Sequence, residues 1–324
     1  MSVALSIPMV QRRIYSRPFL FAVFAFVMSY FILPLYSAGD QSGFCQFYEM
    51  LPNLGFFEGF VYYNSALGSQ EPGYFLLVYI FSGFMDKVLL MSLLNAVLGY
   101  YLGLWLTSKN VPWRIIALLS LNFYLLVLFF AAERLKLGLL FVLMASAYSG
   151  VFRYVYLCFA IFSHVQIALL LVSKLSANIA MSVLPLFRRR LRLRLLFSLV
   201  GALFLIGLLF TVREHILSKM ETYIAFSGGI IHIIKPLIFT AFTLYYARHR
   251  WFEAVSMQAP IILAAFIVGG ERVVLFSYFV FMLYGLQFRR GSNFGVYLFS
   301  MYFFVKGIIF ITNIITYGNG FSAK

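Results

Sequence analysis

Acidic residues are scarce in this chain, and several of them stand beside an arginine or a turn-forming residue. Of 324 residues, ten are aspartate or glutamate and 25 are lysine or arginine. A carboxylate can act as a general base toward a sugar hydroxyl, and a guanidinium can hold a phosphate through two parallel hydrogen bonds. The residues of these types that we single out are Asp40, Glu71, the pair Glu133-Arg134, and the pair Glu271-Arg272, which follows two glycines.

Each of these residues also has a purely structural explanation. Asp40 follows the first apolar run, where a loop or capping acid is common. Glu71 begins the motif Glu71-Pro72-Gly73-Tyr74, where an acid also stabilises the N-terminus of a helix. The pair Glu133-Arg134 interrupts a long apolar stretch and can be an ion pair closed on itself. The sequence leaves both explanations open.

His164 and the aromatic residues are the other candidates. His164 lies within the apolar run 154–172, where a hydrogen-bonded packing histidine is common, and it has no partner at metal-ligand spacing. Eight aromatic residues between positions 44 and 63 can stack on sugar rings or form an interfacial belt. Arg213-Glu214-His215 is typical of a solvated outer segment, and the arginine cluster at 188–194 is typical of an anchor at anionic lipid.

The composition determines the fold class. Hydrophobic residues make up 63% of the chain and charged residues 11%, whereas roughly a quarter of the residues in soluble domains are charged. We therefore predict an all-α, polytopic transmembrane helical bundle of about ten to twelve spans, forming a single integral membrane domain over residues 1–324. The apolar runs are 18–36, 74–84, 88–106, 115–131, 137–152, 154–172, 175–187, 195–212, 230–247, 254–268, 273–287 and 294–313.

The basic residues cluster between these runs, which is typical of cytoplasmic anchors and not of a nucleic-acid-binding face. The run 18–36 is longer than a signal-peptide core and is interpreted as an uncleaved first span. The polar interval 37–71 contains four acids and no lysine or arginine, so it is predicted to lie outside. Two cysteines in different surroundings predict no disulfide framework.

Two threadings of the chain then compete. In the first, the short run 74–84 crosses the membrane, which places Glu71 and Arg134 on opposite faces. In the second, 74–84 is a surface helix of an outer loop at 37–86, and 175–187 is a short returning span. Charge counting does not separate them, but the start at Pro72-Gly73 favours a surface helix. The second threading gathers Asp40, Glu71, Arg134 and Arg272 at the outer face.

The order of these motifs resembles that of the EpsG/Wzy-like family of bacterial polysaccharide polymerases. The resemblance covers about residues 20 to 170. Its layout is also similar to lipid-phosphosugar glycosyltransferases of the GT-C class. The matching elements are Gly39-Asp40 after the first run, then Glu71-Pro72-Gly73-Tyr74, then Glu133-Arg134-Leu135-Lys136-Leu137-Gly138, and then Phe162-Ser163-His164.

The resemblance implies transfer of a glycan from undecaprenyl pyrophosphate to a sugar hydroxyl of another lipid-linked repeat unit, at the outer face of a bacterial inner membrane. Glu71 or Asp40 would accept the proton of the hydroxyl, and Arg134 and Arg272 would stabilise the departing pyrophosphate. His164 and Tyr74 would contact the substrate. The product would be an O-antigen, capsule or exopolysaccharide. The expected partners are the lipid-linked oligosaccharide, membrane lipid and other polysaccharide-assembly proteins, without nucleic acid.

No metal, nucleotide or other cofactor is expected, because the sequence contains no phosphate-binding loop, metalloprotease helix or cysteine metal pair. Three rival functions stay open. The first is a glycosyltransferase that adds a single sugar to a lipid-linked precursor. The second is a polysaccharide transporter or flippase, which is expected to show internal repeats and ionisable residues near the middle of the membrane. The third is a membrane scaffold that tolerates substitution of all these residues.

Overall fold

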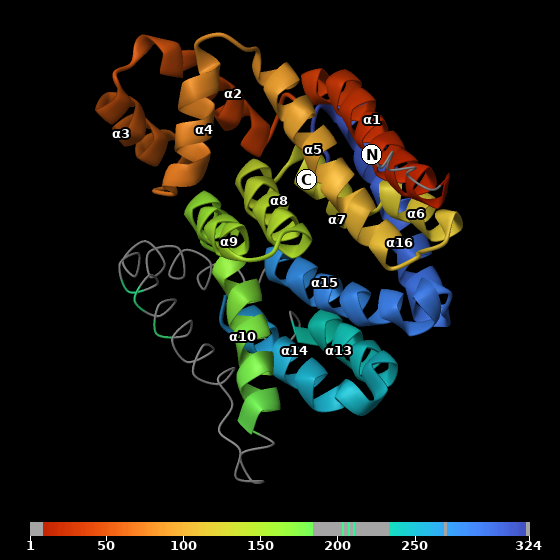
Figure 1. Cartoon of the computed structure of the whole chain (residues 1–324). Coiled ribbons are helices and arrows are strands. Elements are labelled where there is room, and N and C mark those ends of the chain that lie inside the picture. Colours follow the sequence, from red (N-terminus) through yellow and green to blue (C-terminus); the bar gives the residue numbers. More distant parts are fainter. Residues whose placement is uncertain are drawn as a thin grey trace, which may run out of the picture. The chain divides into compact units, whose positions relative to one another are not determined.

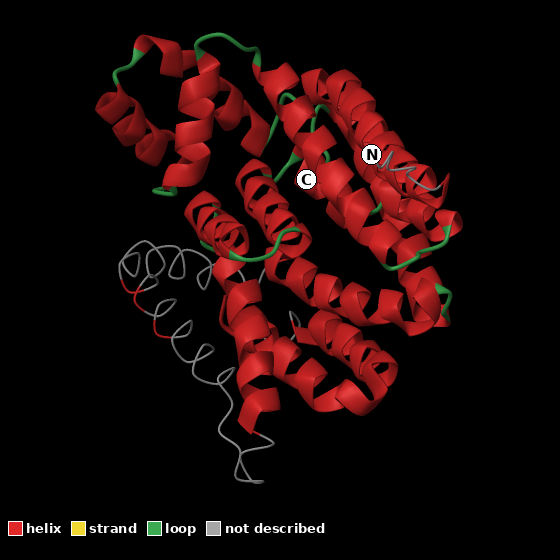
Figure 2. Ribbon diagram, viewed as in Figure 1, coloured by secondary structure: helices red, strands yellow, loops and turns green. Residues whose placement is uncertain are grey.

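The structure is a computed structural model that describes residues 9–183, 233–268 and 271–321, together with residues 203, 207 and 210. In this part of the chain the regular elements are helices and no strand occurs (Figure 2), so the all-α class is confirmed. The predicted run 195–212 falls almost wholly outside the described residues. The arginine cluster at 188–194 and Arg213-Glu214-His215 also lie outside them.

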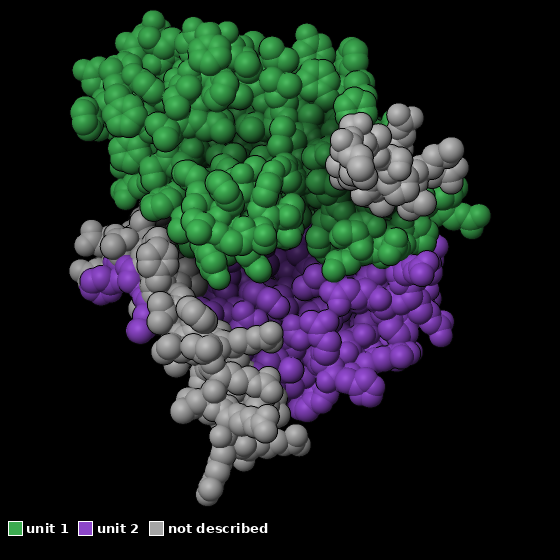
Figure 3. Space-filling model, in the orientation of Figure 1, with its two compact units in different colours: residues 1–165, 298–324 green, residues 166–297 purple. Residues whose placement is uncertain are grey.

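The chain divides into two compact units (Figure 3), residues 1–165 with 298–324 and residues 166–297. The single membrane domain that the sequence predicts over residues 1–324 stays a prediction. Figure 1 labels the helices of the first unit, which are α1 (Met9–Ile32), α2 (Asp40–Met50), α3 (Phe56–Leu67), α4 (Pro72–Ser82), α5 (Lys87–Ser108), α6 (Trp113–Ser120), α7 (Phe123–Phe130), α8 (Glu133–Ala147), α9 (Val151–Ser163) and the later part of α16 (Phe294–Tyr317).

The second unit is a smaller set of packed helices joined by buried hydrogen bonds. Gln258 donates to the hydroxyl of Thr243 at 3.2 Å and to the carbonyl of Ser277 at 3.2 Å, which ties three helices together. Such polar contacts hold helices together where apolar packing alone does not select a neighbour. Its elements are α10 (Ile167–Val183), α13 (Ile234–Ala247), α14 (Trp251–Val268), α15 (Glu271–Gln287), the short turns at Arg248–Arg250 and Phe288–Gly291, and the start of α16.

Helices α1 and α5 form an antiparallel pair (Figure 1). Asn95 donates to the hydroxyl of Ser29 at 2.8 Å. Gly99 and Gly103 follow Asn95 by one and two turns of α5. If Gly99 carried a Cβ, that atom would lie 3.0 Å from the Cβ of Ala25, and a Cβ added to Gly103 would lie 2.8 Å from the Cα of Pro18. Glycines four residues apart let two helix backbones approach closely. Because the pairing is antiparallel, the start of α5 lies level with the end of α1.

Three described helices are long and apolar enough to cross a membrane, at Ser16–Leu35, Lys87–Ser108 and Phe294–Tyr317. The pair α6 and α7 passes the same test together, with a bend of 49° between them. By length and composition these helices are suited to span a membrane, while the count of ten to twelve spans stays a prediction. Helix α4 has 11 residues, about 16 Å. In chain order it falls between α1 and α5, and because those two helices are antiparallel, the segment that joins them begins and ends on the same side, which supports the surface-helix threading.

Two predicted runs are divided differently in the structure. The run 154–172 was expected to be one span containing His164, but α9 ends at Ser163 and α10 begins at Ile167. The run 175–187 was expected to be a separate span, but α10 is continuous from Ile167 to Val183. Both predictions are wrong because a tertiary contact, described below, takes the backbone N–H of Val165 and ends α9.

The close approach of α1 and α5 predicts that Gly103→Ala destabilises the protein. The new Cβ would meet backbone atoms of Pro18, which cannot move aside without separating the helices. We expect a loss of about 1–3 kcal/mol, as for overpacked cores, measured as a lower midpoint of thermal unfolding in detergent micelles. The control is Gly83→Ala, where a Cβ meets nothing within 4 Å. Equal midpoints for the two variants would contradict the packing.

Candidate functional site

Glu71 is positioned by a turn between α3 and α4. Helix α3 ends at Gly68, whose left-handed backbone (φ +56°) is the conformation that terminates many helices. Glu71 is the residue before Pro72, and its extended backbone (φ −78°, ψ 110°) is the one that a following proline imposes. The chain therefore turns inward here, and the side chain of Glu71 is buried with 5% of its surface exposed.

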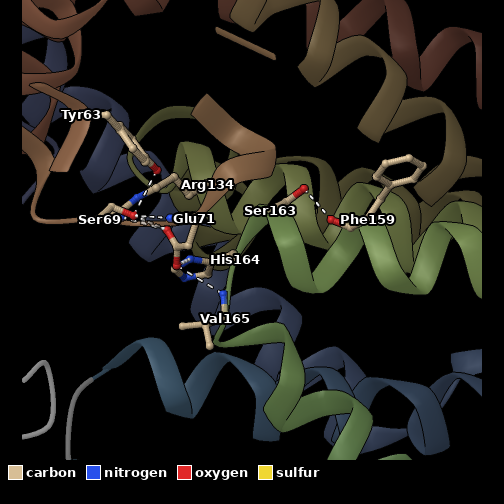
Figure 4. Close-up of polar contacts among 8 residues, drawn as sticks. All are labelled: Tyr63, Ser69, Glu71, Arg134, Phe159, Ser163, His164 and Val165. Carbon is tan, nitrogen blue, oxygen red and sulfur yellow. Dashed lines mark hydrogen bonds and ion pairs between the residues drawn. The ribbon is translucent and has the colours of Figure 1, made fainter. Parts of the chain in front are cut away.

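The carboxylate of Glu71 accepts hydrogen bonds from four donors (Figure 4). Its Oε2 accepts from the hydroxyl of Ser69 at 2.6 Å and from Nη1 of Arg134 at 3.0 Å. Its Oε1 lies 2.7 Å from Nδ1 of His164 and accepts from the backbone N–H of Val165 at 3.2 Å. The hydroxyl of Tyr63 donates to Ser69 at 3.0 Å. We call Tyr63, Ser69, Glu71, Arg134 and His164 the Glu71 cluster.

This contact explains where α9 ends. In a continuous helix the N–H of Val165 would donate to the carbonyl four residues earlier. Here it donates to Glu71, and His164 has an extended backbone (φ −162°, ψ 119°). The N-terminus of α4 also packs on the end of α9, because a Cβ on Gly73 would lie 2.9 Å from backbone atoms of Phe162 and Ser163. Gly73 thus permits the approach that joins Glu71 to His164.

The neighbours of Glu71 determine its charge. Burial by itself would raise the pKa of this carboxyl, but His164 and Arg134 outweigh burial and hold the pKa well below its usual range. Burial raises the pKa of Tyr63, and the positive charge of Arg134 only partly opposes that shift. Glu71 is therefore a carboxylate at neutral pH and a weak proton acceptor, whereas Tyr63 keeps its proton.

A second buried group of charges surrounds Glu133. The hydroxyl of Tyr74 donates to Oε2 of Glu133 at 2.5 Å, and Nζ of Lys87 lies 3.1 Å from Oε1. Lys87 also donates to the side-chain oxygen of Gln41 at 2.8 Å. Lys136 is fully buried, and its amine donates to the carbonyl of Phe129 at 3.3 Å. We call Gln41, Tyr74, Lys87, Glu133 and Lys136 the Glu133 cluster.

The two clusters are neighbours. Glu133 and Arg134 are consecutive residues in the first turn of α8. The ring of Phe44, on α2, lies under both Lys87 and Arg134, with centroid distances of 5.7 Å and 5.9 Å. These distances are within the range of cation–π contacts. Six segments therefore supply one buried polar region: α2, the end of α3 with its following turn, the starts of α4, α5 and α8, and the end of α9.

The structure brings together four of the six residues to which the family resemblance gives a role in the reaction. Glu71, Arg134 and His164 are in the Glu71 cluster, and Tyr74 is in the Glu133 cluster. Asp40 is exposed in the first turn of α2 and belongs to neither cluster, while the next residue, Gln41, does. Arg272 lies in the first turn of α15, in the second unit, and its side chain lies outside the described residues.

The contact between Glu71 and Arg134 also decides between the two threadings. The first threading places these residues on opposite faces of a hydrocarbon layer about 30 Å thick, but their charged atoms are 3.0 Å apart. The first threading is therefore excluded. In the second threading Lys87 lies on the same side as Glu71, as its 3.1 Å contact with Glu133 requires, and Lys136 lies in the first turn of α8 with Glu133.

Sequence reasoning missed four members of the two clusters, and it expected Tyr63 only among the aromatic residues that stack on sugar rings or form an interfacial belt. Ser69 carries no local signal, because its role comes from contacts with Tyr63 and Glu71 across a turn. Gln41 directly follows Asp40, the acid that the sequence analysis singled out. Lys87 has no place in the sequence motifs, and Lys136 appears there only as part of the element that begins at Glu133. The spacing of Lys136 three residues after Glu133 was an available signal, since residues at that spacing share one face of a helix.

Among the described residues, no group of three or more His, Cys, Asp or Glu side chains is placed to hold a metal ion. Comparison of the chain with protein-family models, with curated proteins and with solved structures finds no match. The family resemblance in the sequence therefore stays a prediction, and the chemistry has to be argued from the clusters themselves.

The low pKa of Glu71 predicts an acid-dependent contribution to stability. Because the folded pKa lies well below the usual 4.5, this contribution is complete above pH 4.5 and is lost as the pH falls below that value. Glu71→Gln should destabilise the protein by roughly 3–5 kcal/mol at neutral pH. The difference in thermal unfolding midpoint from the wild type should narrow in acid. A difference that does not change with pH would contradict an ionised Glu71.

The close packing of Gly73 predicts that Gly73→Ala weakens the contact between Glu71 and His164. The Cβ would push α4 away from the end of α9, at a cost of about 1–3 kcal/mol. In the Glu71→Gln background the same substitution should cost less, because the contact is already weakened, and a double-mutant cycle of unfolding midpoints measures this coupling. Gly43→Ala is the matched control, since its Cβ meets only an ordinary contact at 3.5 Å. Additive effects would show that the packing and the cluster are independent.

Proposed function

We propose that this protein is a membrane glycosyltransferase that polymerises lipid-linked oligosaccharide repeat units. It would transfer the glycan from undecaprenyl pyrophosphate to a sugar hydroxyl of a second lipid-linked unit, at the outer face of a bacterial inner membrane. One observation carries the proposal: Glu71, Arg134 and His164, from three separate motifs, converge on one buried contact set beside long apolar helices. An ionisable cluster of this kind in a membrane protein is most often functional.

Arg134 is the member of the Glu71 cluster suited to the leaving group. As the bond to the sugar breaks, negative charge develops on the pyrophosphate, and a cation held in place stabilises it without reorganising. The carboxylate of Glu71 lies 3.0 Å from the guanidinium of Arg134. The side chain of Arg134 has 13% of its surface exposed to solvent, compared with 5% for Glu71. A guanidinium has five N–H donors, so it can keep Glu71 and also donate to a phosphate oxygen.

Because its pKa is low, Glu71 is suited to orient a base and His164 is suited to be that base. Glu71 orients the imidazole through Nδ1, as a carboxylate does in hydrolase triads, and the imidazole is then the group that takes up the proton. In the transfer step the acceptor hydroxyl loses its proton to the imidazole of His164 while its oxygen forms a bond to the anomeric carbon. The bond from that carbon to the phosphate oxygen breaks, and the electron pair leaves with the lipid pyrophosphate.

For Asp40 and Arg272, the roles predicted from the sequence stay predictions. Asp40, as an alternative base, is exposed on α2 and can contact an acceptor sugar from the outer side. Arg272 remains a predicted second ligand of the pyrophosphate. Neither residue is needed for the proton transfer or for the stabilising charge described above.

The test of the proposed function uses purified full-length protein in lipid vesicles with undecaprenyl-pyrophosphate-linked repeat units. We expect a ladder of products. His164→Gln can keep a hydrogen bond to Glu71 but removes the base. Arg134→Lys keeps the positive charge but removes the two parallel N–H donors of the guanidinium. Each substitution should lower the rate of transfer by about 10²–10³-fold. Arg114→Gln, which changes an exposed residue in the first turn of α6, is the control.

Other outcomes separate the rival functions. A single added sugar would identify a single-sugar transferase. Movement of the lipid-linked glycan across the vesicle without a new glycosidic bond would identify a flippase. Full activity in both the His164 and Arg134 variants, with unfolding midpoints equal to the wild type, would sink the proposed site.

A further inference from the structure

The two clusters together contain more buried cations than carboxylates. Glu71 pairs with Arg134, and Glu133 pairs with Lys87. Lys136 is a third cation, fully buried, and it faces a carboxylate that already has a partner. A buried charge without a counter-ion is costly, so an arrangement that keeps an extra cation in place calls for an anion that arrives with a ligand.

Lys87 and Arg134 are the two cations placed to meet such an anion. Their side chains retain 11% and 13% of exposed surface, whereas Glu71, Glu133 and Lys136 retain 5% or less. Both charges also lie over the ring of Phe44, at 5.7 Å and 5.9 Å from its centroid. They therefore share one aromatic side chain and are the more exposed charges of the two clusters.

We propose that Lys87 and Arg134 form a two-point site for the diphosphate group of the lipid-linked substrate, and that Lys136 is the fixed counter-charge that neutralises Glu133 while Lys87 binds phosphate. This inference rests on the proposed function, and it names a substrate-binding residue, Lys87, and a positioning residue, Lys136.

The contacts of Lys87 allow this exchange. Its amine lies 3.1 Å from Glu133, 2.8 Å from the oxygen of Gln41 and 3.3 Å from the sulfur of Cys45. A lysine amine is a compact charge on a flexible stem, so it can rotate from one acceptor to another. When it turns to a phosphate, Glu133 keeps the hydrogen bond from Tyr74 and the charge of Lys136. Arg134 keeps Glu71 and donates through its remaining N–H groups.

A purely structural role for Lys87 makes a different prediction. If Lys87 only neutralises Glu133, its removal lowers stability and leaves the affinity for pyrophosphate unchanged. Lys87→Gln separates the two roles, because Glu133 keeps Lys136 and Tyr74 as partners. The matched control is Lys109→Gln, which lies just after the other end of α5, 22 residues away along the helix and about 33 Å distant.

The experiment measures binding of inorganic pyrophosphate, inorganic phosphate and farnesyl pyrophosphate to the full-length protein in detergent micelles by calorimetry. We expect both pyrophosphate probes to bind more tightly than phosphate. Lys87→Gln should raise their Kd at least about tenfold, as for loss of a hydrogen bond to a charged group. Lys87→Arg should restore most of the affinity, and Lys109→Gln should match the wild type.

Lys136→Met tests the counter-charge with a side chain of similar length. In this variant Lys87 is the only cation among the described residues that faces Glu133, so pyrophosphate affinity should fall although Lys136 itself is fully buried. If the variant does not fold, the salt dependence of pyrophosphate binding in wild type and Lys87→Gln replaces it. Loss of one phosphate-binding cation should make that dependence less steep.

Failure of this inference can be told apart from failure of the proposed function. If the wild type makes polymer but Lys87→Gln binds pyrophosphate as tightly as the wild type, the role of Lys87 is overturned and the polymerase stands. If pyrophosphate binding depends on Lys87 but no glycan is transferred, the anion site stands and the polymerase is overturned. Absence of pyrophosphate binding in the wild type overturns the site itself.

Discussion

Burying the carboxylate of Glu71 is the constraint on which the rest of the site depends. A carboxylate removed from water needs donors on both oxygens, because the low polarity of its surroundings makes an unpaired charge very costly. Ser69 supplies one donor from the turn after α3, Arg134 supplies one from α8, and the chain at His164 and Val165 supplies two after α9. Meeting this need fixes three segments against one another.

The same need shapes the helices around the site. Helix α9 stops where its next backbone donor is taken by Glu71, and α4 approaches that end closely because position 73 has no side chain. The antiparallel contact of α1 and α5 places Lys87 level with the end of α1. There it pairs with Glu133, the neighbour of Arg134. The long apolar helices thus set the level at which the charged ends meet.

Stability and chemistry place different demands on these charges. The contacts that bury Glu71 keep it ionised, which suits a residue that orients others and weakens it as a proton acceptor. In the proposed transfer reaction the proton passes to His164, and the leaving group is met by Arg134 and Lys87, the more exposed charges of the two clusters. Charges held in place before the substrate arrives need little reorganisation in the transition state. A cluster that stabilises the fold can therefore also serve catalysis.

The sequence by itself determined the helical class, the membrane setting and three of the residues that meet, Glu71, Arg134 and His164, since apolar runs and isolated charges are local features. It did not determine the break after Ser163, the bend between α6 and α7, or the inclusion of Lys87 and Lys136. The contacts of Glu71 span 63 and 93 positions. Helices that are apolar on all sides do not specify which faces pack, so only the tertiary structure decided which distant donors Glu71 would bind.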